Sequence, residues 1–270
     1  MDLLLIGDSS ALMGVDTPLL GKLISSRVES LATIGMFSPV GYARMLGLYL
    51  DRGRKPRTLL FLLHPGVLNY QLEWAEVESY GIDDQRAKQP EQPLWKAARD
   101  KLLHEIAYRV IAYPLRGAYG RFYGSASRFQ AWLLDHQGSA VDPALPTDLE
   151  ARPLTDEAEK LRLVKFSPLM KEKLASLADI VDRVSPSNTF VGLTPIANRL
   201  RDPLVERAVT ENLRTLANCL HLPADHALPL PMSVPDGMCV GWHLTEQGRD
   251  FYTRKLAEIL RDILPAKASL

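Results

Sequence analysis

The stretch Leu3-Leu4-Leu5-Ile6-Gly7-Asp8-Ser9-Ser10 decides the fold of this chain. Four consecutive apolar residues ended by a glycine are typical of a central strand in a parallel sheet, because such a strand is buried on both faces. The Gly-Asp-Ser-Ser segment lies where this strand turns toward a helix. Sites in doubly wound sheets form at the carboxyl ends of the strands, so the stretch predicts a serine hydroxyl at the functional edge of the sheet.

Strands and helices alternate through the rest of the first 65 residues. Thr17-Pro18 begins a helix, with Asp16 or Thr17 as its cap, and Ser38-Pro39 begins another. Residues 28–32 and 58–63 are apolar enough to form two further strands. This rhythm is typical of a parallel sheet wound by right-handed crossovers.

The alternation stops between about residues 70 and 162, where we expect a helical insertion with helices near 94–113 and 118–134. It resumes with a predicted helix over 168–184, a strand over 189–193, a helix from Asp202-Pro203, a weak strand near 227–230 and a last helix from Thr245 to about 264. We therefore predict one α/β domain over residues 1–270, with a three-layer, doubly wound, mostly parallel sheet of flavodoxin-like type and the helical insertion.

Composition excludes several classes of function. The 270 residues carry 32 basic and 32 acidic side chains, a net charge of zero that argues against a nucleic-acid partner. The longest apolar runs are shorter than the about 20 residues of a membrane helix, and the first residues lack the basic start of a signal peptide. The chain is expected to be soluble, in the cytoplasm if it is complete, or in the periplasm or cell envelope if a leader or anchor is missing.

No cofactor or metal site is expected. The two cysteines, Cys219 and Cys239, could form a single disulfide, but neither their spacing nor that of the histidines suggests zinc. A nucleotide-binding α/β domain is a weaker interpretation, because the first turn lacks Gly-x-Gly-x-x-Gly and the chain has no Walker-type Gly-Lys-Ser/Thr.

Ser9 and His243 are the residues best placed for chemistry. His243 lies in Gly241-Trp242-His243-Leu244-Thr245, directly before the predicted capped helix. An imidazole held there can take the proton of a serine hydroxyl and return it to a leaving group. Backbone N–H groups near the serine can stabilise an oxyanion. The alternatives are that Gly-Asp-Ser is only a turn and that His243 is a structural histidine near a helix start.

Gly-Asp-Ser after the first strand, together with His243-Leu244-Thr245-x-x-Gly248 before the last helix, resembles the SGNH/GDSL hydrolase superfamily. The segment from Gly7 to Pro65 is most similar to the DltD-like and alginate-acetylation-like proteins of bacterial envelope polysaccharide systems. That similarity is carried by Gly14-Val15-Asp16, Gly41-Tyr42-Ala43 and Leu50-Asp51-Arg52-Gly53. The resemblance to SGNH/GDSL hydrolases covers about the first 70 and the last 80 residues, and the insertion carries no resemblance to a family.

The resemblance implies roles for particular residues. Ser9 would be the nucleophile and His243 the general base, and the N–H groups of Ser9 and Gly35 would donate to the oxyanion. The family's third strand ends in Gly-x-Asn-Asp, whose asparagine also serves the oxyanion; here Asn69 is the nearest asparagine and is displaced. The family places an aspartate three residues before the histidine, where this chain has Val240. Asp236 is the nearest upstream acid. Either it completes a triad with Ser9 and His243, or the site is a Ser-His dyad without an orienting acid.

The resulting hypothesis is serine-dependent acyl-ester chemistry through an acyl-Ser9 intermediate. The reaction would be O-acyl or acetyl transfer, or ester hydrolysis, on a small-molecule or carbohydrate ester. The family resemblance also implies a membrane-bound acyltransferase as a possible partner. The alternative hypothesis, motivated by Val240, is a catalytically impaired binding or partner module in a polysaccharide-modifying system.

Overall fold

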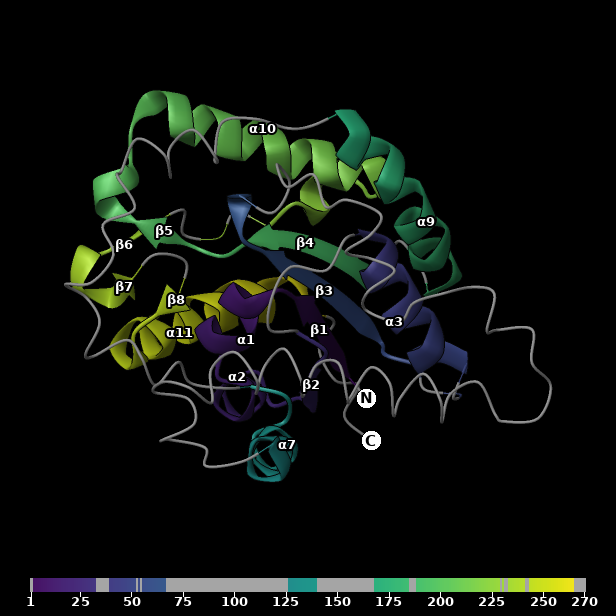
Figure 1. The fold of residues 1–270 in the computed structure, drawn as a ribbon, viewed down its shortest axis with the longest axis horizontal. Coiled ribbons are helices and arrows are strands. Elements are labelled where there is room, and N and C mark those ends of the chain that lie inside the picture. Colours follow the sequence, from purple (N-terminus) through teal and green to yellow (C-terminus); the bar gives the residue numbers. More distant parts are fainter. Residues whose placement is uncertain are drawn as a thin grey trace.

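The centre of the molecule is a four-stranded parallel sheet, seen in a computed structural model (Figure 1). Its strands are β1 (Leu3–Gly7), β2 (Val28–Ser30), β3 (Thr58–Leu63) and β4 (Thr189–Leu193), in the spatial order β2-β1-β3-β4. A parallel bridge from Ala227 to Val191 adds a rudimentary fifth position beside β4. This is the doubly wound order of flavodoxin-like sheets, and it confirms the predicted fold class. The structure describes residues 2–32, 39–51, 53, 55–66, 126–139, 168–184, 188–228, 230, 233–240 and 243–264.

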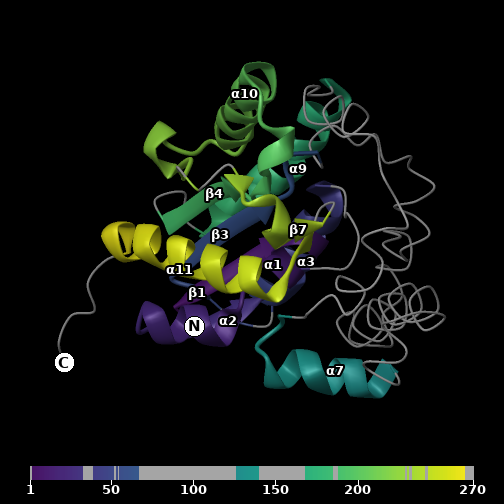
Figure 2. The ribbon, with the colours of Figure 1, turned by 90° about the vertical axis from the view of Figure 1, so that its left-hand side faces the viewer.

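Two groups of helices cover the sheet. The first group is α1 (Ser9–Gly14), α2 (Thr17–Leu23) and α11 (Glu246–Ile263), in which α11 contacts both of the others. The second group is α3 (Pro39–Asp51), α9 (Pro168–Val184) and α10 (Pro203–Cys219), in which α9 contacts both of the others. Figures 1 and 2 show the two groups on opposite faces of the sheet, so the molecule has the predicted three layers.

Burial explains why the strands read as continuous apolar runs. Every residue of β1 and of β3 is buried, because helices lie over both faces. One hydrophobic cluster connects the sheet with both helical layers, from Leu3 in β1 to Leu260 in α11. Such burial is the main favourable term in folding.

The predicted helix starts are confirmed at three positions. Asp16, Asp202 and Thr245 are the N-caps of α2, α10 and α11, and each side-chain oxygen accepts a backbone N–H of its own first turn. This satisfies donors that have no partner inside the helix. None of the helices formed by the described residues is long and apolar enough to span a membrane.

Several short elements were not predicted. They are the parallel pair β5 (Ile196–Ala197) and β6 (Ser233–Val234), the antiparallel pair β7 (Cys239–Val240) and β8 (His243–Leu244), and the 3-10 helices η6 (Asn198–Leu200), η7 (Ala224–His226) and η8 (Asp236–Met238). Two-residue strands give no periodic signal in a sequence. The expected strand near 227–230 is reduced to the single bridge at Ala227, and β2 ends at Ser30 rather than residue 32.

One part of the predicted insertion docks on the sheet edge. The helix α7 (Ala126–Asp135) is followed by residues 136–139, and the backbone oxygen of Gln137 accepts the N–H of Ser30 in β2 at 3.0 Å. Gly138 has φ +84° and approaches Ser30 so closely that a Cβ atom would lie 2.2 Å from its carbonyl oxygen. Only glycine suits this position. The predicted helix over 94–113 and the start of that over 118–134 lie outside the described residues.

Candidate functional site

The turns that follow β1, β3 and β4 meet at the carboxyl edge of the sheet. Gly7 pairs with Leu62 and Leu63 pairs with Leu193, so the residues that follow β1, β3 and β4 lie side by side. The N–H of Thr194 donates to the oxygen of Leu63 at 2.9 Å, which joins the last two turns. Gly35, the predicted oxyanion donor, lies outside the described residues and is not placed in the site.

Ser9 is the first residue of α1, and its backbone is held by the residues before it. Asp8 is the N-cap, and its Oδ1 accepts the N–H of Ser10 at 2.7 Å. At Gly7 a Cβ atom would lie 2.2 Å from the carbonyl oxygen of Leu62 and 2.5 Å from the Cβ of Ala11. Any larger residue would therefore push the turn away from the sheet. The glycine of the Gly-Asp-Ser motif is a packing requirement that sets the position of Ser9.

His243 is held from three sides. It pairs with Val240 across the β7–β8 hairpin, and Thr245 caps α11 two residues later by accepting the N–H of Gly248 at 3.2 Å. Between them, the side chain of Leu244 packs against α1 beside Gly14. β8, which carries His243, and α11, which follows it, are thus packed against the helix that carries Ser9.

The structure brings Ser9 and His243 together. The Oγ of Ser9 lies 3.1 Å from the Nε2 of His243, although the two residues are 234 positions apart in the sequence. Both side chains are partly exposed, so a substrate can reach them. Nucleophile and base within hydrogen-bond reach is the geometry that acyl transfer to a serine requires.

A buried polar layer lies directly behind this pair. The Oδ1 of Asp8 accepts the hydroxyl of Ser10 at 2.5 Å, and its Oδ2 accepts the N–H of His64 at 2.7 Å. The hydroxyl of Ser10 also lies 2.7 Å from that of Thr194. All four residues are at most 2% exposed. This layer was not predicted from the sequence.

Burial shifts the pKa values of the two ionisable groups in this layer, Asp8 and His64. Desolvation raises the pKa of Asp8, whereas its hydrogen bonds with Ser10 and His64 and the nearby charge of His243 act to lower it. Desolvation lowers the pKa of His64 to about 3, with a smaller contribution from repulsion by His243. The Nδ1 of His64 accepts the N–H of Gly66 at 3.1 Å, so the proton of the neutral ring is on Nε2. His64 is therefore uncharged near neutral pH.

Asp236 has a different partner from the one the sequence suggested. It is the first residue of η8, and its Oδ1 accepts the N–H of Arg199 at 2.7 Å. This contact joins η8 to η6 and does not involve His243. A role for Asp236 in orienting His243 therefore stays a prediction. Asn69, the other suggested oxyanion residue, lies outside the described residues.

Comparisons with known proteins add little to the geometry. Neither the known protein-family models nor the curated proteins match the sequence. Among solved structures, a lipase/acylhydrolase from Enterococcus faecalis aligns over 100% of both chains, with a TM-score of 0.40 and 10% sequence identity. No group of three or more histidine, cysteine or acidic side chains that could bind a metal occurs in the described part of the chain.

Proposed function

We propose that this protein carries out serine-dependent acyl-ester chemistry, as an esterase or an O-acyltransferase. The observation that carries the proposal is the 3.1 Å contact between the Oγ of Ser9 and the Nε2 of His243 at the carboxyl edge of the sheet. The Gly-Asp-Ser and His-Leu-Thr-x-x-Gly segments, which resemble those of SGNH/GDSL hydrolases, support it.

The first half of the reaction forms an acyl-enzyme. His243 Nε2 takes the hydroxyl proton of Ser9 as its Oγ attacks the carbonyl carbon of the ester. The carbonyl oxygen becomes an oxyanion, and the N–H of Ser9, which has no acceptor among the described residues, is available to stabilise it. The tetrahedral intermediate collapses by breaking the bond to the leaving oxygen, and His243 gives its proton to that oxygen. The acyl group is then bonded to Ser9.

The second half decides between hydrolysis and transfer. His243 takes a proton from water or from an acceptor hydroxyl as that oxygen attacks the acyl carbon, and returns it to the Oγ of Ser9 as the acyl–Ser9 bond breaks. We favour a carbohydrate as the ester or the acceptor, because the first 65 residues resemble proteins of envelope polysaccharide modification. The same resemblance favours a membrane-bound acyltransferase as the donor. Adding an oligosaccharide to an acetyl-ester reaction would separate the two outcomes: transfer gives an acetylated sugar, hydrolysis only acetate.

Labelling of Ser9 tests the proposal. A fluorophosphonate or p-nitrophenyl acetate should modify the folded protein, and peptide mass spectrometry should place the adduct on Ser9. Ser9→Ala and His243→Gln should abolish or strongly slow the modification. Ser10→Ala is the matched control and should still be labelled, because its hydroxyl is buried against Asp8 and Thr194. Equal labelling of wild type and Ser9→Ala would refute the proposal.

A second function is favoured by one observation, the bond from Asp236 to Arg199. With Val240 at the family's acid position, a Ser-His pair that lacks this acid could serve as a binding or partner module of a polysaccharide-modifying system. Folded protein that resists all acyl probes but binds an oligosaccharide, with Ser9→Ala binding equally well, would support this function over catalysis.

A further inference from the structure

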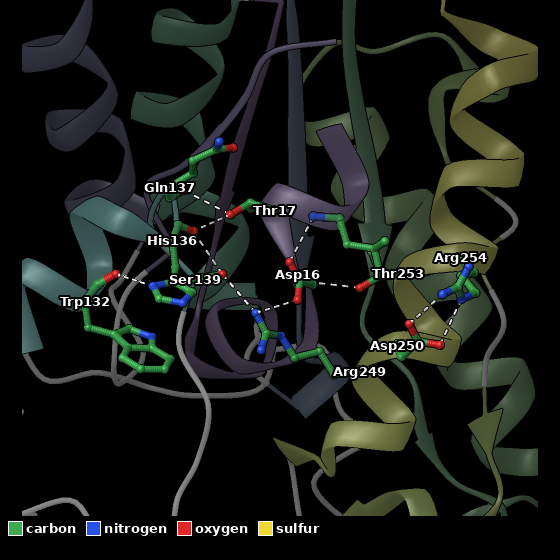
Figure 3. Close-up of polar contacts among 11 residues, drawn as sticks. Asp16, Thr17, Trp132, His136, Gln137, Ser139, Arg249, Asp250, Thr253 and Arg254 are labelled. Atoms are coloured by element: carbon green, nitrogen blue, oxygen red, sulfur yellow. Dashed lines mark hydrogen bonds and ion pairs between the residues drawn. The ribbon is translucent and has the colours of Figure 1, made fainter. Parts of the chain in front are cut away.

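A cluster of polar side chains lies just beyond the end of α1, the helix that begins at Ser9. This Arg249 cluster takes its members from the start of α2, from α11 and from the residues after α7, and Figure 3 shows them together: Asp16, Ser139, Arg249 and Thr253. The last three are at most 7% exposed. Buried polar groups cost free energy unless they are paired, and here the pairing joins segments that lie far apart in the sequence.

Arg249 is the centre of the cluster. Its Nη2 lies 3.4 Å from the Oδ2 of Asp16 and donates to the hydroxyl oxygen of Ser139 at 2.9 Å. The hydroxyl of Ser139 gives its own proton to the carbonyl oxygen of His136 at 3.0 Å, so its oxygen is left to accept from the arginine. Asp16 uses its two oxygens separately, since Oδ1 accepts the N–H of Leu19 as the cap of α2 and Oδ2 faces Arg249. Both partners of Arg249 are therefore held in place by bonds of their own.

Thr253 makes a second link between the same two segments. Its Oγ1 accepts the backbone N–H of Asp16 at 3.0 Å. Thr253 lies one turn after Arg249 on the same face of α11, so this helix holds Asp16 by its backbone and by its side chain. Hydrogen bonds and ion pairs depend on direction as well as distance, so two of them fix how the start of α2 lies against α11.

The two linked segments are the ones that carry the reactive pair. Asp16 follows closely on the end of α1, whose first residue is Ser9. Arg249 lies at the start of α11, and its N–H donates to the oxygen of Thr245 at 2.8 Å, which ties it to the residues directly after His243. The 3.1 Å contact between Ser9 and His243 is therefore spanned on one side by the Arg249 cluster. A shift of α1 along α11 would have to break the contacts of Asp16 with Arg249 and with Thr253.

We infer that Arg249 is a positioning residue for acyl transfer, whose ion pair with Asp16 keeps Ser9 within hydrogen-bond distance of His243. The inference rests on the proposed function, because it concerns the alignment of nucleophile and base. Arg249 does not touch the reacting atoms. A buried ion pair is weak evidence for stability, but it can fix the register between two elements. Since Ser139 accepts from the same nitrogen of Arg249, the docked residues 136–139 of the insertion belong to the same positioning device.

The rate of Ser9 acylation in folded variants tests the inference. Arg249→Ala should slow labelling by a fluorophosphonate about ten- to a hundredfold, because small misplacements of reacting groups cost that much. With p-nitrophenyl acetate the loss should fall on kcat and leave KM unchanged, and Arg249→Lys should recover part of the rate. Asp16→Asn is a second variant, in which the amide oxygen still caps α2 but the charge that faces Arg249 is lost, so labelling should slow as well.

Two controls separate alignment from general loss of stability. Arg254→Ala removes an exposed arginine from the same helix and should keep the wild-type rate. Leu216→Ala truncates a fully buried side chain of α10, on the opposite face of the sheet. It should lose at least as much stability as Arg249→Ala and still be labelled at the wild-type rate. If Leu216→Ala slows labelling as much as Arg249→Ala, the inference is wrong.

The double variant shows whether the two residues act through one contact. Arg249→Ala combined with Asp16→Asn should be no slower than Arg249→Ala alone, because both changes remove the same ion pair. Losses that multiply would mean independent effects and would contradict the inference. Wild type that resists labelling rejects the proposed function and the inference together. Labelled wild type with equal rates in Arg249→Ala and Asp16→Asn overturns the inference and leaves the proposed function standing.

Discussion

At the scale of single residues, the glycine of the Gly-Asp-Ser motif is the most demanding position. A Cβ atom at Gly7 would lie 2.2 Å from the backbone oxygen of Leu62, an atom that cannot move without distorting β3. We expect Gly7→Ala to lower the free energy of unfolding by about 3 kcal/mol and to slow Ser9 acylation, since α1 must shift.

The matched control is Gly47→Ala in α3. The nearest atom to its added Cβ is the Cδ1 of Ile180, at the ordinary contact distance of 3.8 Å. This variant should be stabilised by about 0.5–1 kcal/mol, because alanine favours helix. Urea unfolding measures both variants, and equal stabilities would show that the turn has room which the structure does not give it.

His64 should make the protein sensitive to acid. Burial lowers its pKa from 6.5 to about 3 in the folded state, so between these values only the unfolded chain binds the proton. Its contribution to stability is complete above about pH 6.5 and is lost as the pH falls, by up to about 1.4 kcal/mol per unit. Asp8 acts in the opposite sense, because its raised pKa gives a contribution that is lost as the pH rises.

His64→Asn isolates the histidine in this comparison. The asparagine oxygen can replace Nδ1 as acceptor of the Gly66 N–H, but it does not titrate. Urea unfolding at pH 7, 6, 5 and 4 should show a shallower loss of stability in the variant than in wild type. Parallel slopes for His64→Asn and wild type would contradict the prediction.

The residues also show what sequence reasoning could reach. Ser9 and His243 were predicted from local signals, a strand end and a capped helix, and the structure places their side chains 3.1 Å apart. Asp8 was overlooked although it lies inside the motif. Its importance comes from accepting the N–H of His64, 56 residues away, and no local pattern records such a contact. Asp236 was chosen for its proximity in sequence, but η8 directs its carboxylate to Arg199.

At the scale of elements, a buried arginine joins α11 to α2 and to the residues after α7. Arg249 lies 3.4 Å from Asp16 and donates to the hydroxyl of Ser139 at 2.9 Å (Figure 3). Asp16 also caps α2 through the N–H of Leu19. We expect Arg249→Ala to cost about 2 kcal/mol of stability, because it leaves a partly buried carboxylate without its cation.

The matched control lies on the same helix. Arg254 bonds Asp250 through two nitrogens, yet both side chains are more than half exposed. Solvent screens this pair, so Arg254→Ala should unfold at the same urea concentration as wild type. A similar loss in both variants would mean that the contact of Arg249 with Asp16 is no stronger than a surface ion pair.

The elements were predicted unevenly, for a physical reason. Long helices and buried strands were placed within one or two residues, as in α9 and β4, because their caps and apolar runs are local. The β7–β8 hairpin that presents His243 was not predicted. Its strands are two residues long, and β8 is held by contacts with α1 and α11, which a sequence window does not contain.

At the scale of the whole molecule, the core predicts cooperative unfolding. One hydrophobic cluster contains β1, β3, β4 and the buried face of α11, so the first and last described elements share the same contacts. A shared core favours a single unfolding transition of the elements that contribute to it. The slowest amide hydrogens of β1 and α11 should therefore exchange with one common free energy.

Native-state hydrogen exchange combined with Leu256→Ala tests this cooperativity. Leu256 is fully buried in α11, and its truncation should cost about 2–4 kcal/mol. If unfolding is global, the exchange free energies of β1 and β3 fall by the same amount as that of α11, although these strands are distant in sequence. If α11 unfolds separately, only its own amides lose protection. That result would also mean that His243, in β8 just before α11, can leave Ser9 while the sheet stays folded, and the site would then be gated by the last helix.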